Sequence, residues 1–233
     1  MVQGTSPMPG LNAPDNELAS MVLASSKYQR WRNLVESQGN KILQHDILSV
    51  ISRTPGTWYV ALIDCLLLTP EENIIKRCVT IRGESVVIVP ILQCIDDSQL
   101  YTIMVEQRCI CDGALHIGFP AGSTDEIANF RSMACQELRE ETGIEILPEE
   151  LIELSEGISL NSSLSDDLIY FYAFRKDVTR TWLDSIDNSN SGIHGEGEYI
   201  KVKVLTLSDS FNMATPSTLI GESLVRKVLG IYI

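Results

Sequence analysis

The chain has 233 residues, of which 44% are apolar and 21% charged, with fifteen Gly and nine Pro. This composition is typical of a globular protein with a sizeable core and excludes a disordered or fibrous chain. Eighteen Lys and Arg against 31 Asp and Glu leave a net charge of −13, so no general positive field can hold a nucleic acid or an anionic membrane surface. The apolar stretches are also too short for a membrane helix, and we expect neither partner.

In chain order, residues 1–16 read as a mobile leader that is rich in Gly and Pro. A helix is expected from Asn16, as a possible cap, to Gly39. The later apolar patterns predict helices near 129–142 and 217–229, and strands near 47–52, 58–68, 77–81, 86–93, 101–107, 115–119, 154–160, 168–175 and 199–205. Strands on both sides of an internal helix predict an α+β sandwich.

Six cysteines occur without CxxC spacing, and no secretory signal pattern opens the chain. This usage predicts reduced thiols and a cytoplasmic location. Cys109 and Cys111 form the tightest pair, but no His or further Cys lies near enough in sequence to favour zinc. His45 and His116 are expected to be structural.

The most informative segment is GSTDEIANFRSMACQELREETGI, residues 122–144. On a helix, Glu137, Glu140 and Glu141 stand at positions i, i+3 and i+4 and share one face. Three carboxylates on one stripe repel one another, whereas Mg²⁺ or Mn²⁺ would use them as hard oxygen ligands. By themselves, however, three glutamates also fit an ordinary solvated helix face.

The frame around these glutamates resembles the Nudix hydrolase family, whose box reads G-x5-E-x7-R-E-U-x-E-E-x-G-U, with U aliphatic. Gly122 fits its first position, and the end of the box is matched without a gap by Glu137, Leu138, Glu140, Glu141, Gly143 and Ile144. The resemblance implies a Nudix α/β/α sandwich with a mixed sheet. It also implies a divalent cation, Mg²⁺ or Mn²⁺, held by the three glutamates and by the backbone carbonyl of Ala121.

Three positions depart from the family pattern. Ala128 stands where the first Glu of the box belongs, and Gln136 stands where the Arg belongs. Gly118 replaces a Glu that relatives acting on ADP-sugars commonly place before their Pro-Ala-Gly. Gln136 can donate a hydrogen bond to a neighbouring Glu but cannot neutralise it. We expect metal binding to survive because the three helix carboxylates are present.

Further stretches resemble plant-type ADP-sugar diphosphatases: residues 28–37, 82–83, 106–108 and 197–202. The implied organisation is the leader, an N-terminal helix and β dimerisation region at 17–84, and a Nudix domain at 85–233. The implied activity is Mg²⁺-dependent cleavage of a nucleoside diphosphate sugar, such as ADP-ribose or ADP-glucose, to AMP and a sugar phosphate. A homodimer is implied as well.

The base that activates water is expected outside the metal-binding helix, on the loop at 188–198, as in relatives that act on ADP-ribose and ADP-glucose. Glu196 and Glu198 are the candidates there, with His194 as a lesser one. For the substrate phosphates the candidates are Arg82 and Arg108, because a guanidinium offers a bidentate fork. Trp58 or Tyr59 could stack on an adenine, although core packing accounts for both.

Two alternatives remain open at this point. The departures at Gly118, Ala128 and Gln136 also fit a degenerate Nudix domain that binds a nucleotide without turnover. A Nudix enzyme acting on dinucleotides or on RNA caps is the other alternative, against which the acidic charge balance argues unless a local basic strip is present.

Overall fold

The computed structural model describes residues 14–52, 57–109, 112–123, 129–192, 199–213 and 215–232. The expected leader at residues 1–13 lies outside these ranges. The chain divides into two compact units. The first holds the chain up to Gly83 together with residues 159–167, and the second holds most of the chain from Glu84 onward.

The first unit contains two helices and a three-stranded antiparallel sheet within the described residues. The helices are α1 (Asn16–Ala24) and α2 (Ser26–Ser37), and the strands, in sheet order, are β1 (Lys41–Ile51), β2 (Val60–Leu68) and β3 (Ile74–Ile81). Buried side chains from both layers form its core, among them Tyr28, Trp31, Ile63 and Ile81. The strands expected in this part of the sequence therefore form a separate three-stranded sheet.

The single helix expected from Asn16 to Gly39 is in fact two helices, and the cap is Asp15 rather than Asn16. The Asp15 carboxylate accepts the Leu18 N–H at 2.8 Å, so α1 starts one residue after it. Ser25 breaks the helix because its backbone is extended, and its hydroxyl then caps α2 through the Tyr28 N–H at 3.2 Å. Apolar spacing continues through Ser25, which is why the break is not visible in the pattern.

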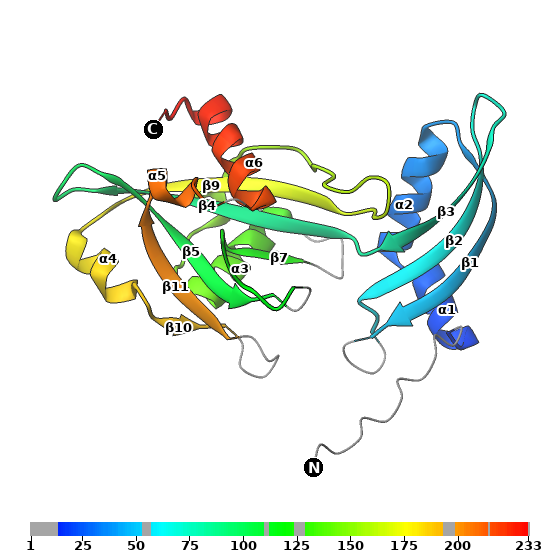
Figure 1. The fold of residues 1–233 in the computed structure, drawn as a ribbon, viewed down its shortest axis with the longest axis horizontal. Coiled ribbons are helices and arrows are strands. Elements are labelled where there is room, and N and C mark those ends of the chain that lie inside the picture. Colours follow the sequence, from blue (N-terminus) through cyan, green and yellow to red (C-terminus); the bar gives the residue numbers. More distant parts are fainter. Residues whose placement is uncertain are drawn as a thin grey trace, which may run out of the picture. The chain divides into compact units, whose positions relative to one another are not determined.

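The second unit is built on one mixed sheet (Figure 1). Along its main path the order is β10 (Asn190–Ser191), β11 (Ile200–Thr206), β5 (Leu100–Arg108), β4 (Glu84–Cys94), β9 (Leu168–Val178) and β8 (Ile152–Glu153). Two short strands lie off this path: β6 (Leu115–Gly118) pairs with β5, and β7 (Ala121–Ser123) pairs with β4. The β4 and β9 pairing is parallel, and the other strand pairs in the described sheet are antiparallel.

Helices cover both faces of this sheet, which confirms the predicted α/β/α sandwich. Alternate residues of β4 serve opposite cores: Val86 and Ile88 pack with α3 (Phe130–Thr142) and α4 (Arg180–Ile186), whereas Val87 and Val89 face the other side. The second core includes Leu207 of α5 (Leu207–Ser210), Phe211 directly after it, and Val225 of the π-helical turn Val225–Leu229. Partly buried Ile220 and Leu224 of α6 (Pro216–Leu224) pack against it. Apolar residues on both faces of β4 explain its nearly continuous hydrophobic run.

Several boundaries differ from the sequence expectations. The strand expected at 154–160 is wrong: β8 ends at Glu153, and only Ile158 bridges to β9 in that stretch. Gly157 approaches Tyr170 so closely that a Cβ there would lie 3.1 Å from its ring, so the chain bends over β9 instead of pairing continuously. Two short elements, strand β7 and helix α4, are additional to the expected ones.

None of the helices in the described ranges is both long and apolar enough to cross a lipid bilayer.

Candidate functional site

Helix α3 carries the three glutamates, and its two ends are defined by specific residues. The Asn129 side chain accepts the N–H groups of Arg131 and Ser132 at the start of the helix. Gly143 ends the helix in the left-handed conformation, with φ of 74°, as its position in the sequence predicts. On the apolar side, Met133, Ala134 and Leu138 are buried in the sheet core. This packing fixes the rotation of the helix and hence the direction of its carboxylates.

Glu141 is held against strand β7. The residue is only 6% exposed, and its carboxylate accepts the backbone N–H of Ala121 at 2.9 Å. The β7 backbone is itself fixed by antiparallel pairing with β4, where Ala121 lies opposite Val87. The segment Ala-Gly-Ser of β7 therefore acts as a short strand that presents backbone groups to the helix.

Glu137 lies over Gly122 on the same strand. A Cβ atom built on Gly122 would overlap the Glu137 carboxylate, far inside ordinary van der Waals contact. The absence of a side chain at position 122 thus lets the carboxylate rest directly on the β7 backbone. This close approach gives a physical reason for Gly at the first position of the box, which sequence reasoning had treated only as a motif match.

Glu140, the third carboxylate, is hydrogen-bonded along the helix. Its Oε1 accepts the side-chain amide of Gln136 at 2.9 Å. This contact is the one expected for Gln at the place of the family's Arg: it orients the carboxylate but adds no positive charge. The other substituted box position, Ala128, lies outside the described residues.

A further contact joins the last turn of α3 to β10. The Ser191 hydroxyl donates to the backbone carbonyl of Glu141, and the Gly192 N–H donates to the carbonyl of Glu140 at 3.2 Å. Glu196, Glu198 and His194 all lie in the segment 193–198, outside the described residues. The segment that carries these candidate bases therefore departs from a point hydrogen-bonded to the glutamate helix. Nothing in the sequence pattern marks Ser191 for this contact.

The two candidate arginines have different surroundings. Arg82 belongs to the first unit, where its guanidinium donates to the Tyr59 hydroxyl at 3.2 Å and lies 3.9 Å from an Asp167 carboxylate oxygen. Arg108 ends β5 in the second unit, and its guanidinium donates to the carbonyl of Gly113 in the following hairpin. Both side chains are exposed enough to reach a ligand by changing rotamer.

The two aromatic candidates for adenine stacking are in the first unit. Trp58 is 8% exposed and belongs to the core of that unit, as the packing interpretation requires. Tyr59 is half-buried, and its ring lies beside the Arg82 guanidinium at 5.8 Å.

A groove of about 440 Å³ lies elsewhere on α3 and is lined in part by Cys135, Arg139 and Glu145. Helical geometry places Cys135 and Arg139 on a different face from Glu137 and Glu141. The groove therefore does not coincide with the carboxylates that rest on β7.

The chemistry available at β7 is that of oxygen donors. Glu137 and Glu141 contact neighbouring residues of one strand, and Glu140 lies on the adjoining position of the same helix. Carboxylate oxygens are the ligands that Mg²⁺ and Mn²⁺ prefer, and a divalent cation would relieve the repulsion among three like charges. The donor set thus fits the metal that the sequence resemblance implies.

Comparison with known proteins agrees with this fold. The second unit is an α/β/α sandwich whose helix glutamates meet the short strand β7. The chain matches a solved structure described as an ADP compounds hydrolase with a TM-score of 0.55 and 16% identity, over 82% of this chain and 94% of that one. This likeness establishes a shared fold.

In sequence, the chain is 24% identical over 133 residues to a protein named Nudix hydrolase 14, chloroplastic, from Arabidopsis thaliana. The match covers 53% of this chain and 42% of that relative, so it spans less than half of the relative's length. Comparison with models of protein families finds no match.

Proposed function

We propose that the protein is a Nudix hydrolase that cleaves the diphosphate of a nucleoside diphosphate sugar, of the ADP-ribose or ADP-glucose type, to AMP and a sugar phosphate. The observation that carries this proposal is the contact of the Glu137 and Glu141 carboxylates with Gly122 and Ala121. It brings the ends of the box, separated by some fifteen positions in the sequence, to one place. The similarity to a Nudix hydrolase and to an ADP compounds hydrolase supports it.

The proposed metal ligands for Mg²⁺ or Mn²⁺ are the carboxylates of Glu137, Glu140 and Glu141 and the backbone carbonyl of Ala121. When bound, the cation supplies charge neutralisation for the diphosphate and the phosphoryl group in transfer. The chain's contribution is to hold the ligands: burial and the Ala121 N–H fix Glu141, the bare backbone at Gly122 receives Glu137, and Gln136 orients Glu140.

We propose Glu196 or Glu198 as the base that takes a proton from the attacking water. The water oxygen attacks one phosphorus, the bridging P–O bond breaks, and two phosphomonoesters leave. The flanking contacts support this assignment, because Gly192 is hydrogen-bonded to the end of α3. A fully extended chain spans at most about 3.5 Å per residue, so Glu196 stays within about 14 Å of Gly192.

Arg82 and Arg108 are proposed to bind the substrate phosphates. Their support is chemical: each offers a planar fork of donors in a chain of net charge −13. Arg108 extends from the end of β5 in the unit that carries the glutamates.

The second candidate function is a nucleotide-binding module without turnover. The Gln136 contact favours it, because an amide replaces the guanidinium that the family places beside these glutamates. Such a module would still bind a metal and an ADP-sugar through the carboxylates described above.

We also propose a homodimer that uses the first unit. Large apolar side chains are exposed on two of its strands, at Leu43, Leu48 and Ile51 of β1 and Ile74 and Ile75 of β3. Apolar residues clustered on a surface are a common sign of an interface. A cytoplasmic location is proposed as well, since the cysteines among the described residues are all free thiols.

One screen tests the proposed function. The purified protein is incubated with ADP-ribose, ADP-glucose, UDP-glucose, dinucleotides and a capped RNA, each with Mg²⁺ or Mn²⁺, and release of phosphomonoesters is measured. The proposal expects hydrolysis of an ADP-sugar that stops when the cation is chelated. Metal-dependent binding of an ADP-sugar without product would instead identify the binding module, and cleavage of only dinucleotides or caps would assign another substrate class.

A further inference from the structure

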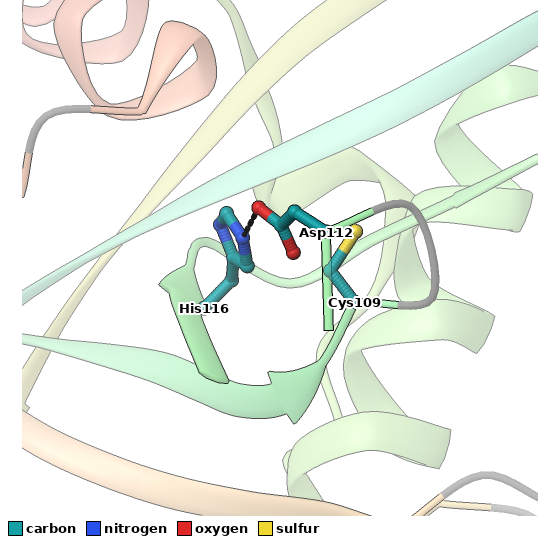
Figure 2. Close-up of side chains that lie close together, drawn as sticks. All are labelled: Cys109, Asp112 and His116. Atoms are coloured by element: carbon teal, nitrogen blue, oxygen red, sulfur yellow. Dashed lines mark hydrogen bonds and ion pairs between the residues drawn. The ribbon is translucent and has the colours of Figure 1, made fainter. Parts of the chain in front are cut away.

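Three potential metal ligands meet in the hairpin between β5 and β6 (Figure 2). They are the thiol of Cys109, the carboxylate of Asp112 and the imidazole of His116, and one ligand atom from each lies within 4.8 Å of the others. Sequence spacing alone leaves Cys109 without a nearby His, and zinc was not expected here. The structure nevertheless places His116, seven residues along the chain, beside the thiol.

The backbone of the hairpin holds this arrangement in place. The Cys109 N–H donates to the Ala114 carbonyl at 2.8 Å, and the Gly113 N–H donates to the Cys109 carbonyl at 2.9 Å. Gly113 has φ of 72°, a left-handed conformation that favours glycine at the turn. On the strand side, Arg108 lies opposite Leu115 in the β5 and β6 pairing. These hydrogen bonds hold Cys109 close to the described residues on the other side of the hairpin.

The Asp112 carboxylate contacts His116 and the backbone of Ala114. Its Oδ1 accepts the Ala114 N–H at 2.9 Å, and its Oδ2 lies 2.7 Å from His116 Nε2. The Ala114 N–H, followed by His116, lowers the pKa of the Asp112 carboxyl below its usual value.

We propose that Cys109, Asp112 and His116 form a zinc site, separate from the glutamate site on α3. The donor set of one thiolate, one imidazole and one carboxylate suits Zn²⁺, whereas the all-oxygen glutamates suit Mg²⁺. Three protein ligands leave a fourth tetrahedral position for water. Zinc bonds of about 2.0 to 2.3 Å would set the donor atoms roughly 3.3 to 3.7 Å apart, so closing the site needs only small side-chain shifts.

A catalytic Cys, His and Asp arrangement fits this geometry less well. In such a triad the His lies between the nucleophile and the carboxylate, accepting from one and donating to the other. Here the hydrogen bond among the three side chains joins Asp112 Oδ2 to His116 Nε2, and none links the imidazole to the Cys109 thiol (Figure 2). The order of contacts favours shared coordination of an ion over activation of the thiol.

The site is also accessible to an ion from solvent. The side chains of His116 and Asp112 are 42% and 51% exposed, and Cys109 is half-buried. Zinc entry therefore requires no unfolding of the sheet. Binding displaces the thiol proton, which leaves for solvent as the thiolate coordinates the ion.

Zinc titration of the whole protein, freed of metal and kept with excess Mg²⁺ to occupy oxygen-only sites, tests the proposal. We expect one equivalent of Zn²⁺ to bind, and Co²⁺ at the same site to give a thiolate-to-cobalt charge-transfer band. Cys109→Ser, Asp112→Asn and His116→Ala should each weaken Zn²⁺ binding at least about 100-fold, because loss of even an outer partner of a ligand costs 10 to 100-fold. Cys78→Ser, which changes an exposed thiol on β3, should leave the affinity unchanged.

Circular dichroism and melting curves check that each variant is folded, and the cobalt spectrum of the wild type needs no variant at all. Absence of the charge-transfer band would overturn the proposal, as would equal zinc affinity in the wild type and the Cys109 and His116 variants. Loss of the site in Cys111→Ser together with its retention in Asp112→Asn would also overturn the stated ligand set. Because the readout is metal binding, none of these results depends on hydrolysis, and failure of the proposed activity would leave the zinc test intact.

Discussion

The close contact between Gly122 and Glu137 allows the proposed metal site to be perturbed with one methyl group. In Gly122→Ala the new Cβ overlaps the Glu137 carboxylate, whereas ordinary contact begins near 3.4 Å. The carboxylate must therefore move by more than about 1 Å, and a misplacement of about 1 Å at a reacting centre can cost roughly 100-fold in rate. We expect Mg²⁺-dependent turnover to fall by about that factor.

The fold should tolerate the same change. Gly122 lies in a strand without a left-handed backbone, so Ala fits its conformation. Because Ala also lowers the conformational entropy of the unfolded chain, it stabilises the folded protein by about 0.4 to 1 kcal/mol. The steric cost is limited because the obstacle is the end of a flexible Glu side chain. The net change in the free energy of unfolding should stay within about 1 kcal/mol, which denaturant titration measures.

Gly118→Ala is the matched control. A Cβ at Gly118 would meet only the Ser217 hydroxyl, at 3.9 Å, so the same Gly to Ala change adds no clash. Isothermal titration with Mn²⁺ and turnover of the ADP-sugar identified by screening should distinguish the two variants. Wild-type metal affinity and turnover in Gly122→Ala, or equal losses in both variants, would refute the reasoning.

Three further predictions concern the proposed enzyme. The free energy of unfolding of Glu141→Gln should be within about 1 kcal/mol of the wild-type value, because the amide oxygen can still accept the Ala121 N–H. Its Mn²⁺ affinity should fall at least about 10-fold, and unchanged affinity in a calorimetric titration would remove Glu141 from the ligand set. Either Glu196→Gln or Glu198→Gln should lower kcat by about 100-fold or more with little effect on substrate binding; single-turnover rates equal to the wild type in both would exclude the segment as the source of the base. Light scattering should give a molar mass of twice 25.9 kDa for the wild type, and Ile74→Lys, at a residue that is 66% exposed, should shift that mass toward the monomer. A monomeric wild type would count against the proposed dimer interface on the first unit.

Local sequence signals predict some parts of this structure well. The helix expected near 129–142 is α3, Phe130–Thr142, and the residues that bound it, Asn129 and Gly143, act within one turn of chain. The apolar strands of the central sheet are likewise visible, because a strand buried on both faces needs a continuous hydrophobic run.

Other features were not predictable from the spacing of apolar residues or of single residue types. The break at Ser25 interrupts apolar spacing that would have suited one helix, and the bend at Gly157 depends on a ring at Tyr170. At the glutamate site, the sequence indicates which residues take part but not that Glu137 needs the bare backbone of Gly122. The hairpin cluster was missed because spacing along the chain says little about which side chains a tight turn brings together.

The parallel pairing of β4 with β9 has a consequence for how the site comes into being. Every residue of β4 from Glu84 to Cys94 pairs with a residue 84 positions further along the chain. Strand β7 and helix α3, whose contact assembles the glutamates, both lie within the loop closed by that pairing. Pairings of such long sequence separation form slowly, since the entropy of closing the loop must be overcome before the contacts form. During synthesis, therefore, the glutamate helix leaves the ribosome well before the strand that completes its supporting sheet, and a nascent chain that stops short of Leu168 should carry the whole box without a stable platform to hold it.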